Sequence, residues 1–246
     1  MGKVYFASDF HLGIPNAIRS LEREKKLVSW LHMAAQDAER SYLVGDIFDF
    51  WFEYKHAVPR GYTRLLGTLS ELTDAGVHIE VFTGNHDMWM FDYLEKECGV
   101  TIHRQPIRVT HQSKTLYIGH GDGLGPGDKG YKFLKRFFSN PFCQWLFARL
   151  HPNLGIGLAN YWSRKSRAAS GFKDTFKGED QEWLLQFCRS YILEDPSINY
   201  FIFGHRHLLL DFKIGNHSRY INLGDWFTQC NYAVMEDGEL RLEVYK

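Results

Sequence analysis

The sequence predicts an α/β protein, because short β-rich runs alternate with helical patterns through its first half. Each predicted strand is followed within three residues by an Asp, Asn or His, usually beside a glycine. These apolar strands are predicted at 4–7, 42–44, 79–82, 116–118 and 200–203. With 246 residues, 44% of them apolar, the chain is long enough to bury one substantial core, and we predict a single domain over 1–246.

Helices are predicted between the strands of the first half. Apolar residues recur at helical spacing over 27–38 and over 65–72, and the pattern over 88–97 is also helical. Gly76 and Gly99 are placed to end the second and third of these helices. Layers of helix on a sheet are the arrangement that such alternation predicts.

The second half of the chain changes character. Residues 125–195 open with the turn-rich Gly-Pro-Gly-Asp and then read as helices dense in aromatic residues. Because metal-ligand-type runs lie on both sides of this block, we predict a helical cap insertion over 125–195, placed above the site. Beyond residue 198, β-type runs predict an antiparallel meander with strands at 210–214, 219–223, 231–236 and 240–245.

Residues of the types that bind divalent metals follow the five strands. The runs are Asp9-Phe10-His11, Gly45-Asp46, Gly84-Asn85-His86-Asp87, Gly119-His120 and Gly204-His205-Arg206-His207. Carboxylates, imidazoles and an amide can share two divalent ions and leave positions for water and phosphate. We assign one ion to Asp9, His11, Asp46 and His207, and the second to Asp46, Asn85, His120 and His205. Asp9 and His11 are two residues apart, as are His205 and His207. In an extended segment the side chains of each such pair are expected to point to the same side.

His86 lies between a predicted ligand and Asp87, and we expect it beside the ions without binding them. There it would protonate a leaving oxygen or stabilise a phosphoryl oxygen, with Asp87 orienting its ring. The predicted catalytic residues are therefore His86, Asn85 and Asp87. Each motif alone has a simpler interpretation, because Asn and Asp favour turns and short His motifs are common on surfaces. Five motifs in order, each after a strand, favour the metal site.

Composition argues against several classes of function. The formal net charge is +0, so no overall basic field indicates nucleic-acid binding. The four cysteines are isolated, which favours reduced thiols in a cytosolic protein over disulfides or a zinc knuckle. The N-terminus runs directly into a strand, which argues against a cleaved signal peptide, and no uncharged apolar stretch is long enough to span a membrane. We expect a cytoplasmic protein.

The motif series D-x-H, G-D-x-x-D, G-N-H-D, G-H and G-H-x-H spans residues 9–207 and resembles that of the calcineurin-like metallophosphoesterases. The resemblance implies a four-layer α/β/β/α sandwich and two divalent ions, usually Mn²⁺. Within that superfamily the chain is similar to the hydrolases of UDP-2,3-diacylglucosamine in lipid A biosynthesis, in the runs 9–12, 45–49 and 120–124. Helical insertions after the fourth motif also characterise those hydrolases.

This resemblance implies cleavage of the pyrophosphate of UDP-2,3-diacylglucosamine to UMP and 2,3-diacylglucosamine 1-phosphate, by a peripheral protein on the inner membrane. It implies substrate contacts at Asp128, Ser166, Ser170, Lys173 and His205. The sequence departs from the family pattern at Ser170, where the family has Asn, and at His86, where well-studied members have Arg. Glycines and a proline at 125–127 also replace more polar residues. No obligate protein partner is expected.

The aromatic residues of the predicted cap allow two interpretations. At helical spacing they would ordinarily be core, yet Lys135, Arg136 and Arg149 interrupt them, as in an amphipathic helix at a bilayer surface. In the second interpretation acyl chains lie among Phe133, Phe137, Phe138, Phe142 and Trp145. The alternative function is a soluble metallophosphatase or phosphodiesterase for a nucleotide or small phosphoester. A binding protein that has lost catalysis is a third, against which the complete ligand set argues.

Overall fold

The computed structural model describes residues 2–126, 129–170 and 175–246, without the side chains of 129, 164 and 166–170. Its strands are β1 (Lys3–Ala7), β2 (Ala38–Val44), β3 (Ile79–Phe82), β4 (Thr101–His103), β5 (Ile107–His111), β6 (Lys114–Ile118), β7 (Ile198–Phe203), β8 (Leu209–Ile214), β9 (Ser218–Leu223), β10 (Cys230–Glu236) and β11 (Glu239–Tyr245). Its helices are α1 (Ala17–Ala34), α2 (Thr63–Asp74), α3 (Tyr93–Cys98), α4 (Lys129–Phe138), α5 (Pro141–Phe147), α6 (Pro152–Ser170) and α7 (Trp183–Glu194), with a 3₁₀ turn at Glu179–Gln181.

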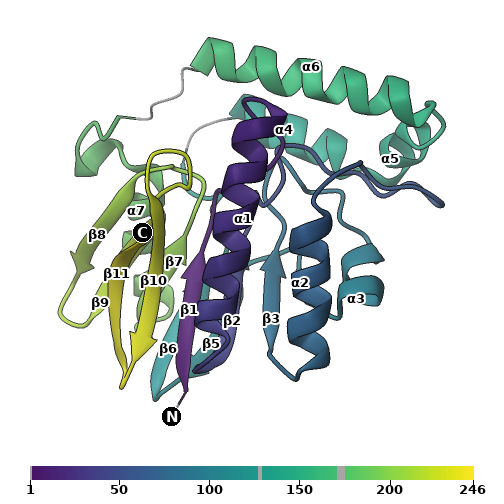
Figure 1. The fold of residues 1–246 in the computed structure, drawn as a ribbon. Coiled ribbons are helices and arrows are strands. Elements are labelled where there is room, and N and C mark those ends of the chain that lie inside the picture. Colours follow the sequence, from purple (N-terminus) through teal and green to yellow (C-terminus); the bar gives the residue numbers. More distant parts are fainter. Residues whose placement is uncertain (1, 127–128, 171–174) are drawn as a thin grey trace.

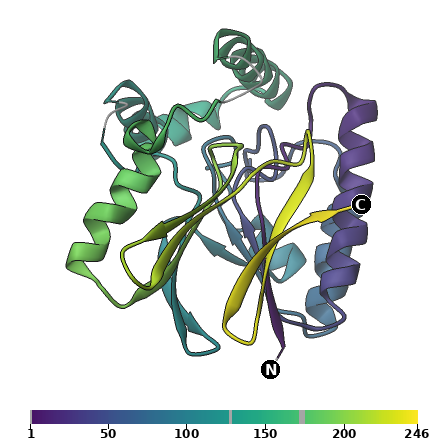
Figure 2. The same cartoon turned by 90° about the vertical axis from the view of Figure 1, so that its left-hand side faces the viewer.

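The strands form two sheets that face each other. One has six strands in the order β11-β10-β1-β2-β3-β4, and the other has five in the order β5-β6-β7-β9-β8. The helices α1 and α2 cover the outer face of the first sheet, and α7 covers the outer face of the second (Figures 1 and 2). The predicted four-layer α/β/β/α sandwich is confirmed.

Three apolar clusters fill the spaces between these four layers. Alternation along β1 shows how the sequence builds them, since successive side chains of a strand point to opposite faces. Tyr5 and Ala7 pack against the helices, whereas Val4 and Phe6 pack between the two sheets. Because both faces of the central strands are covered, these strands read as nearly continuous apolar runs.

The predicted antiparallel meander after residue 198 is wrong. Strands β8 and β9 pair in the five-stranded sheet, whereas β10 pairs antiparallel with β1 and β11 in the six-stranded sheet. The chain therefore crosses from one sheet to the other between β9 and β10. Alternating apolar residues predict a strand, but they do not predict which other strand it pairs with. The crossing between the sheets therefore could not be predicted from the sequence.

Two predicted helices begin at other residues than expected. Helix α1 starts at Ala17, ten residues before the first apolar position of the predicted helical pattern at 27. The side chain of Asn16 accepts a hydrogen bond from the backbone N–H of Arg19 and so caps this start. Helix α3 starts at Tyr93 and not at residue 88. The buried carboxylate of Glu53 accepts hydrogen bonds from the N–H groups of 91–93, which are the unpaired donors of a helix start.

The predicted insertion of residues 125–195 contains helices of two kinds. Helices α4, α5 and α6 lie above the carboxyl ends of the central strands, and we call these three helices the cap (Figure 1). Helix α7 instead contributes Leu184, Leu185 and Cys188 to the apolar cluster behind the second sheet. The cap thus lies over the end of the sandwich where the metal-ligand-type runs meet.

Candidate metal centre

The predicted ligands lie where the carboxyl ends of the parallel strands meet, beneath the cap. Asp9, Asp46 and Asn85 follow β1, β2 and β3 of the first sheet. His120 follows β6, and His205 and His207 follow β7, both in the second sheet. Each sheet therefore supplies about half of the side chains, and they converge across the gap between the two sheets.

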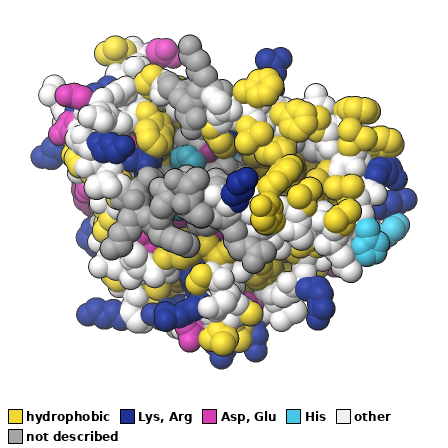
Figure 3. All heavy atoms as spheres, turned by 90° about the horizontal axis from the view of Figure 1, so that it is seen from above, with side chains coloured by type: hydrophobic (Ala, Val, Ile, Leu, Met, Phe, Trp, Pro, Cys, Tyr) yellow, Lys and Arg dark blue, Asp and Glu magenta, His cyan; other side chains and the backbone are white. Residues whose placement is uncertain are grey.

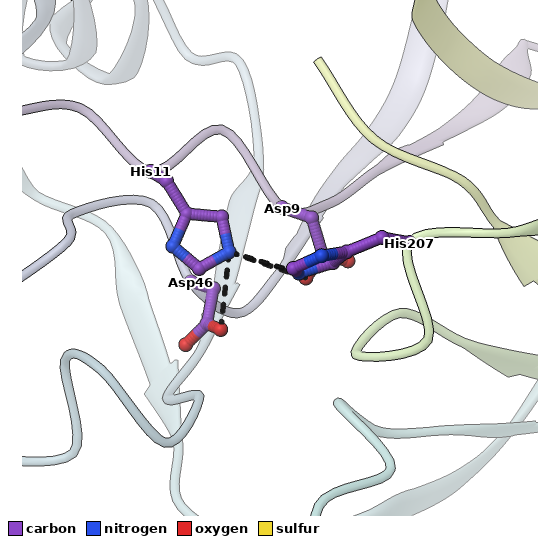
Figure 4. A group of neighbouring side chains, drawn as sticks. All are labelled: Asp9, His11, Asp46 and His207. Atoms are coloured by element: carbon purple, nitrogen blue, oxygen red, sulfur yellow. Dashed lines mark hydrogen bonds and ion pairs between the residues drawn. The ribbon is translucent and has the colours of Figure 1, made fainter. Parts of the chain in front are cut away.

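The first group of side chains consists of Asp9, His11, Asp46 and His207 (Figure 4). The Nε2 atom of His11 lies 3.1 Å from Nε2 of His207 and 3.4 Å from Oδ2 of Asp46. The Nε2 atom of His207 also lies 3.1 Å from Oδ1 of Asp9. One ligand atom from each of the four residues falls within a space of 4.8 Å, which suits a single divalent ion.

The second group consists of Asp46, Asn85, His120 and His205. The Oδ1 atom of Asn85 lies 3.3 Å from Nε2 of His120 and 2.9 Å from Nδ1 of His205. The Oδ2 atom of Asp46 lies 3.4 Å from Nε2 of His120, the same distance that separates it from Nε2 of His11. Asp46 therefore stands between the two groups, in the position of a shared ligand.

The bonding of Asp9 indicates that these residues fit a bound cation. Its Oδ2 atom accepts hydrogen bonds from the hydroxyl of Ser8 and the backbone N–H of His205. Its Oδ1 atom is buried within the first group and accepts no hydrogen bond in the described part of the chain. A buried carboxylate oxygen normally accepts a hydrogen bond, so one that faces two imidazoles without accepting one is the kind of ligand atom that a metal ion would satisfy.

Backbone strain is concentrated at these residues. The φ angles of Asp9, His11, Asp46, His205 and His207 are 58°, 42°, 51°, 69° and 51°, in the left-handed region that residues other than glycine rarely adopt. Such strain persists only where surrounding structure enforces it, and it clusters at functional sites. It also corrects an expectation, because neither Asp9 and His11 nor His205 and His207 lie on an extended segment. Asp9 and His11 meet because the chain bends there, and His205 and His207 enter different groups.

The buried guanidinium of Arg23 stabilises the bend of the chain at residues 9–11 through hydrogen bonds. It comes from α1 and donates to the carbonyl oxygens of Phe10, His11 and Ile14. It also lies 4.5 Å from the ring centroid of Phe227, which stacks on the His11 ring. Sequence reasoning missed Arg23, because a charged residue within a helical pattern reads as part of the solvated face.

Arg206 anchors the loop that carries His205 and His207. Its Nε atom lies 3.1 Å from Oε1 of the buried Glu182, and its guanidinium lies 4.1 Å from the ring centroid of Trp183. Both partners belong to the start of α7 and the residue before it. The outer helix layer thereby positions the loop that carries His205 and His207.

His86 lies at the edge of the site, and its ring contacts Asp49. The Nδ1 atom of His86 lies 3.0 Å from the carbonyl oxygen and 3.6 Å from Oδ1 of Asp49. The same Oδ1 atom lies 3.6 Å from Nδ1 of His11. His86, His11 and Asp49 also form a second cluster of metal-ligand type. Asp49 belongs to the G-D-x-x-D motif, yet its role was not predicted from the sequence.

The expectation that Asp87 orients the ring of His86 is wrong. One oxygen of the buried Asp87 carboxylate accepts hydrogen bonds from the backbone N–H groups of Ile47 and Phe48, and the other from that of Gly84. Asp87 thus ties the loop after β3 to the loop after β2. Because these loops carry Asn85 and Asp46, Asp87 sets the spacing between two candidate ligands.

The electrostatic environment keeps the two central carboxylates ionised. Burial raises the pKa of Asp9, but the His207 imidazole and its neighbours outweigh burial and hold that pKa well below its usual range. Burial also lowers the pKa of His120, but the Asp46 carboxylate outweighs it and raises the pKa to about 10. Burial, helped by nearby His120, lowers the pKa of His205 to about 4. His205 is therefore a neutral imidazole that can bind an ion directly, whereas an ion bound by His120 would have to displace the proton that Asp46 stabilises there.

Gly84 leaves no room for a side chain, and this leads to a testable expectation. A Cβ atom at this position would overlap the carboxylate and backbone of Asp46. We therefore expect Gly84→Ala to displace Asp46, to lower the metal content measured by mass spectrometry, and to lower the melting temperature. Gly67→Ala in α2, where a Cβ atom meets nothing within 4 Å, is the matched control. Full metal occupancy in Gly84→Ala would show that Asp46 can move without loss of the site.

The substrate contacts implied by the family resemblance fall mostly outside the described residues. Asp128 and Lys173 lie outside them entirely, and for Ser166 and Ser170 only the backbone of α6 is described. His205 is described, and its ring lies among the second group with Nδ1 toward Asn85.

Comparison with known proteins identifies the family. A family model described as calcineurin-like phosphoesterase matches residues 2–209. The UDP-2,3-diacylglucosamine hydrolase of Porphyromonas gingivalis is 38% identical, over 98% of this chain and 97% of that protein. The hydrolase of the same name from Aeromonas salmonicida is 29% identical, over 97% of this chain and 91% of that protein. The chain therefore belongs to the calcineurin-like phosphoesterase family and is a metal-dependent hydrolase.

Proposed function

We propose that this chain hydrolyses the pyrophosphate of UDP-2,3-diacylglucosamine to UMP and 2,3-diacylglucosamine 1-phosphate. One observation carries the proposal: an apolar cavity of about 480 Å³ opens onto Asn85 and His86, at the edge of the candidate metal centre. A substrate with acyl chains near its phosphate needs such a cavity, whereas a small phosphoester does not. The names of the relatives that are 38% and 29% identical agree with this substrate.

The apolar cavity lies between the cap and the loops after β2 and β3, and we call it the apolar chamber. The loops contribute Phe50, Met88 and Trp89, and the cap contributes Leu134, Phe137, Phe138, Ala159 and Trp162. Two hydrogen bonds join its walls: Trp89 donates from Nε1 to the carbonyl oxygen of Phe138 at 2.9 Å, and Ser163 donates to Asp49 at 2.8 Å. Its polar lining residues, Asp49, Asn85, His86 and Ser163, gather at the metal-centre side. Acyl chains bound here would therefore place their phosphate at the ligands.

The outer surface of the cap is also apolar. Half or more of each of these side chains is exposed: Phe133, Phe137, Phe142, Trp145, Leu154, Tyr161 and Trp162. Hydrophobic side chains gather on this face with Lys and Arg along their border (Figure 3). The interpretation of Phe133, Phe137, Phe142 and Trp145 as buried core is therefore wrong.

We propose that this face of the cap binds the cytoplasmic surface of the inner membrane. In the described residues no helix is both long enough and apolar enough to cross a bilayer. Exposed aromatic and leucine side chains bordered by cations are typical of a surface that lies in the lipid interface. A substrate held in the membrane by its acyl chains would then enter the apolar chamber from that face.

In this proposal the two ligand groups each hold a divalent ion, and we propose Mn²⁺, the metal that the family resemblance implies; carboxylate, amide and imidazole ligands are compatible with it. The chemistry that such ions supply is polarisation of phosphoryl oxygens and lowering of the pKa of water. His86 donates a hydrogen bond or a proton to an oxygen of the reacting phosphates, with its ring fixed by Asp49. The apolar chamber and cap exclude bulk water around the acyl half.

We expect Phe137→Ala to raise the Michaelis constant for UDP-2,3-diacylglucosamine in detergent micelles about tenfold. The reason is that burying a large apolar side chain against its ligand is worth roughly 1.5–3 kcal/mol. Hydrolysis of bis(p-nitrophenyl) phosphate, which reaches the ligands without acyl chains, should change little. Phe176→Ala is a matched control, because Phe176 is exposed and stacks on Phe212 away from the apolar chamber.

Two results would contradict the proposal. Equal losses on both substrates, with unchanged melting temperature, would mean that Phe137 acts on the metal centre and not on acyl chains. Hydrolysis of nucleotides or phosphomonoesters by the unaltered protein, without detergent-dependent hydrolysis of the acylated substrate, would favour the alternative of a phosphatase for small phosphoesters.

A further inference from the structure

A second cavity, of about 520 Å³, borders the other side of the candidate metal centre. Gly84, His120 and Asp122 form its wall toward the ligands. His103 at the end of β4, residues 104–106 between β4 and β5, and side chains of α4 and α5 form the outer walls. We call this cavity the polar cleft.

The lining of the polar cleft differs chemically from that of the apolar chamber. It contains the cations Lys132 and Lys135 of α4, and the amides Gln105 and Gln144. The Nζ atom of Lys135 lies 2.6 Å from Oδ2 of Asp122 and donates to the carbonyl oxygen of Asp122 at 3.0 Å. A cation is thereby held two residues from the candidate ligand His120.

Apolar surfaces lie between these polar groups. Phe91, Pro106 and Met88 line the polar cleft together with the lysines and glutamines. Cations, amides and flat apolar surfaces are the groups that bind the phosphate, the base edge and the base face of a nucleotide. A volume of about 520 Å³ is within the usual range for a pocket that encloses a small ligand.

The two cavities approach the candidate metal centre from opposite sides of the loop after β3. Asn85 and His86 line the apolar chamber, Gly84 and His120 line the polar cleft, and Met88 lines both. A diphosphate bound at the candidate ligands could place one of its halves in each cavity. A further cavity, of about 720 Å³ beside α1, is lined by none of the candidate ligands and offers no such direction.

We propose that the polar cleft is the subsite for the nucleoside monophosphate half of the substrate. We assign the phosphate of this half to Lys135, which is held beside Asp122, and to Lys132 on the same helix, and the base to Gln105 and Gln144. The inference rests on the proposed function. It adds an assignment of the two halves of the substrate to the two sides of the candidate metal centre. The apolar chamber takes the acylated sugar phosphate, and the polar cleft takes UMP.

The test is calorimetric titration of the metal-loaded protein with UMP, with inorganic phosphate and with 2,3-diacylglucosamine 1-phosphate. We expect Gln105→Ala and Lys132→Gln each to raise the dissociation constant for UMP about tenfold, the effect of one lost hydrogen bond to a charged or polar partner. The dissociation constant for the acylated sugar phosphate should stay within about twofold. Gln36→Ala and Lys25→Gln, at exposed positions of the α1 region, are the matched controls.

Several results would overturn the inference. The inference is overturned if Gln105→Ala and Lys132→Gln both leave the affinity for UMP unchanged. It is also overturned if these variants lose affinity only for the acylated sugar phosphate. An equal loss for UMP and inorganic phosphate in Gln105→Ala would mean that Gln105 does not contact the nucleoside. If the unaltered protein binds UMP in the polar cleft but does not hydrolyse UDP-2,3-diacylglucosamine, the proposed function fails and the nucleotide subsite stands.

Discussion

Replacing Asp46 with alanine is expected to abolish turnover and to reduce bound metal to well below two ions per chain. One oxygen of Asp46 lies 3.4 Å from Nε2 of both His11 and His120, so the carboxylate serves both ligand groups at once. Its other oxygen accepts a hydrogen bond from the backbone N–H of His86 at 2.9 Å. Loss of the side chain therefore removes charge from both ion positions and releases the loop that carries Asn85.

The measurement is metal content together with the rate of hydrolysis, after thermal melting has shown that the variant is folded. Asp46→Asn keeps the shape of the side chain and removes its charge, which separates packing from metal binding. Asp74→Ala, at the exposed end of α2, is the control for loss of a carboxylate elsewhere. Two fully occupied ion positions in an inactive Asp46→Ala protein would assign Asp46 a different role.

The second large effect is expected at His86. We expect His86→Ala to keep its metal and to lose a factor of about 10²–10⁴ in rate, the usual contribution of a positioned acid or base. The His86 ring contacts Asp49 through Nδ1 and lies at the junction of the apolar chamber and the metal centre. It is therefore placed to act on the reacting phosphates without holding an ion.

The structure also allows the alternative that His86 is itself a metal ligand, because His86, His11 and Asp49 form a cluster of metal-ligand type. Metal content distinguishes the two roles: a loss of one ion in His86→Ala would make His86 a ligand, and Asn85 would then need another assignment. His56→Ala is the control, because His56 is exposed and lies outside both ligand groups.

The sequence was sufficient to predict the strands that precede the candidate metal centre and to name the candidate ligands that follow them. An apolar run followed by Asp, Asn or His is a local pattern. Strand β1 and Asp9, or strand β3 and Asn85, lie within about ten residues of one another, so a short segment of sequence is enough to predict them. Parallel strands bring such positions to one edge of a sheet, so convergence of Asp9, Asp46 and Asn85 follows from the pattern. The layered α/β fold follows from the same alternation.

Other features depend on contacts between residues that are far apart in the chain. Glu53 sets the start of α3 from 40 residues away. Asp87 joins two loops through backbone N–H groups, whose partners no sequence pattern reveals. Arg23 reads as a solvated helix residue, yet it is buried under the bend that carries His11. Backbone hydrogen bonds and burial of this kind are set by packing, and periodicity along the chain does not report them.

The sequence by itself determined the set of candidate ligands and the strands that precede them, because both follow from local patterns a few residues long. The tertiary structure alone decided how the two sheets face each other, and therefore that Asp46 stands between the two ligand groups. It also decided that the cap encloses an apolar chamber on one side of the loop after β3 and leaves a polar cleft on the other. The physical reason is that a cavity is the space left between packed elements, and its shape belongs to no single segment.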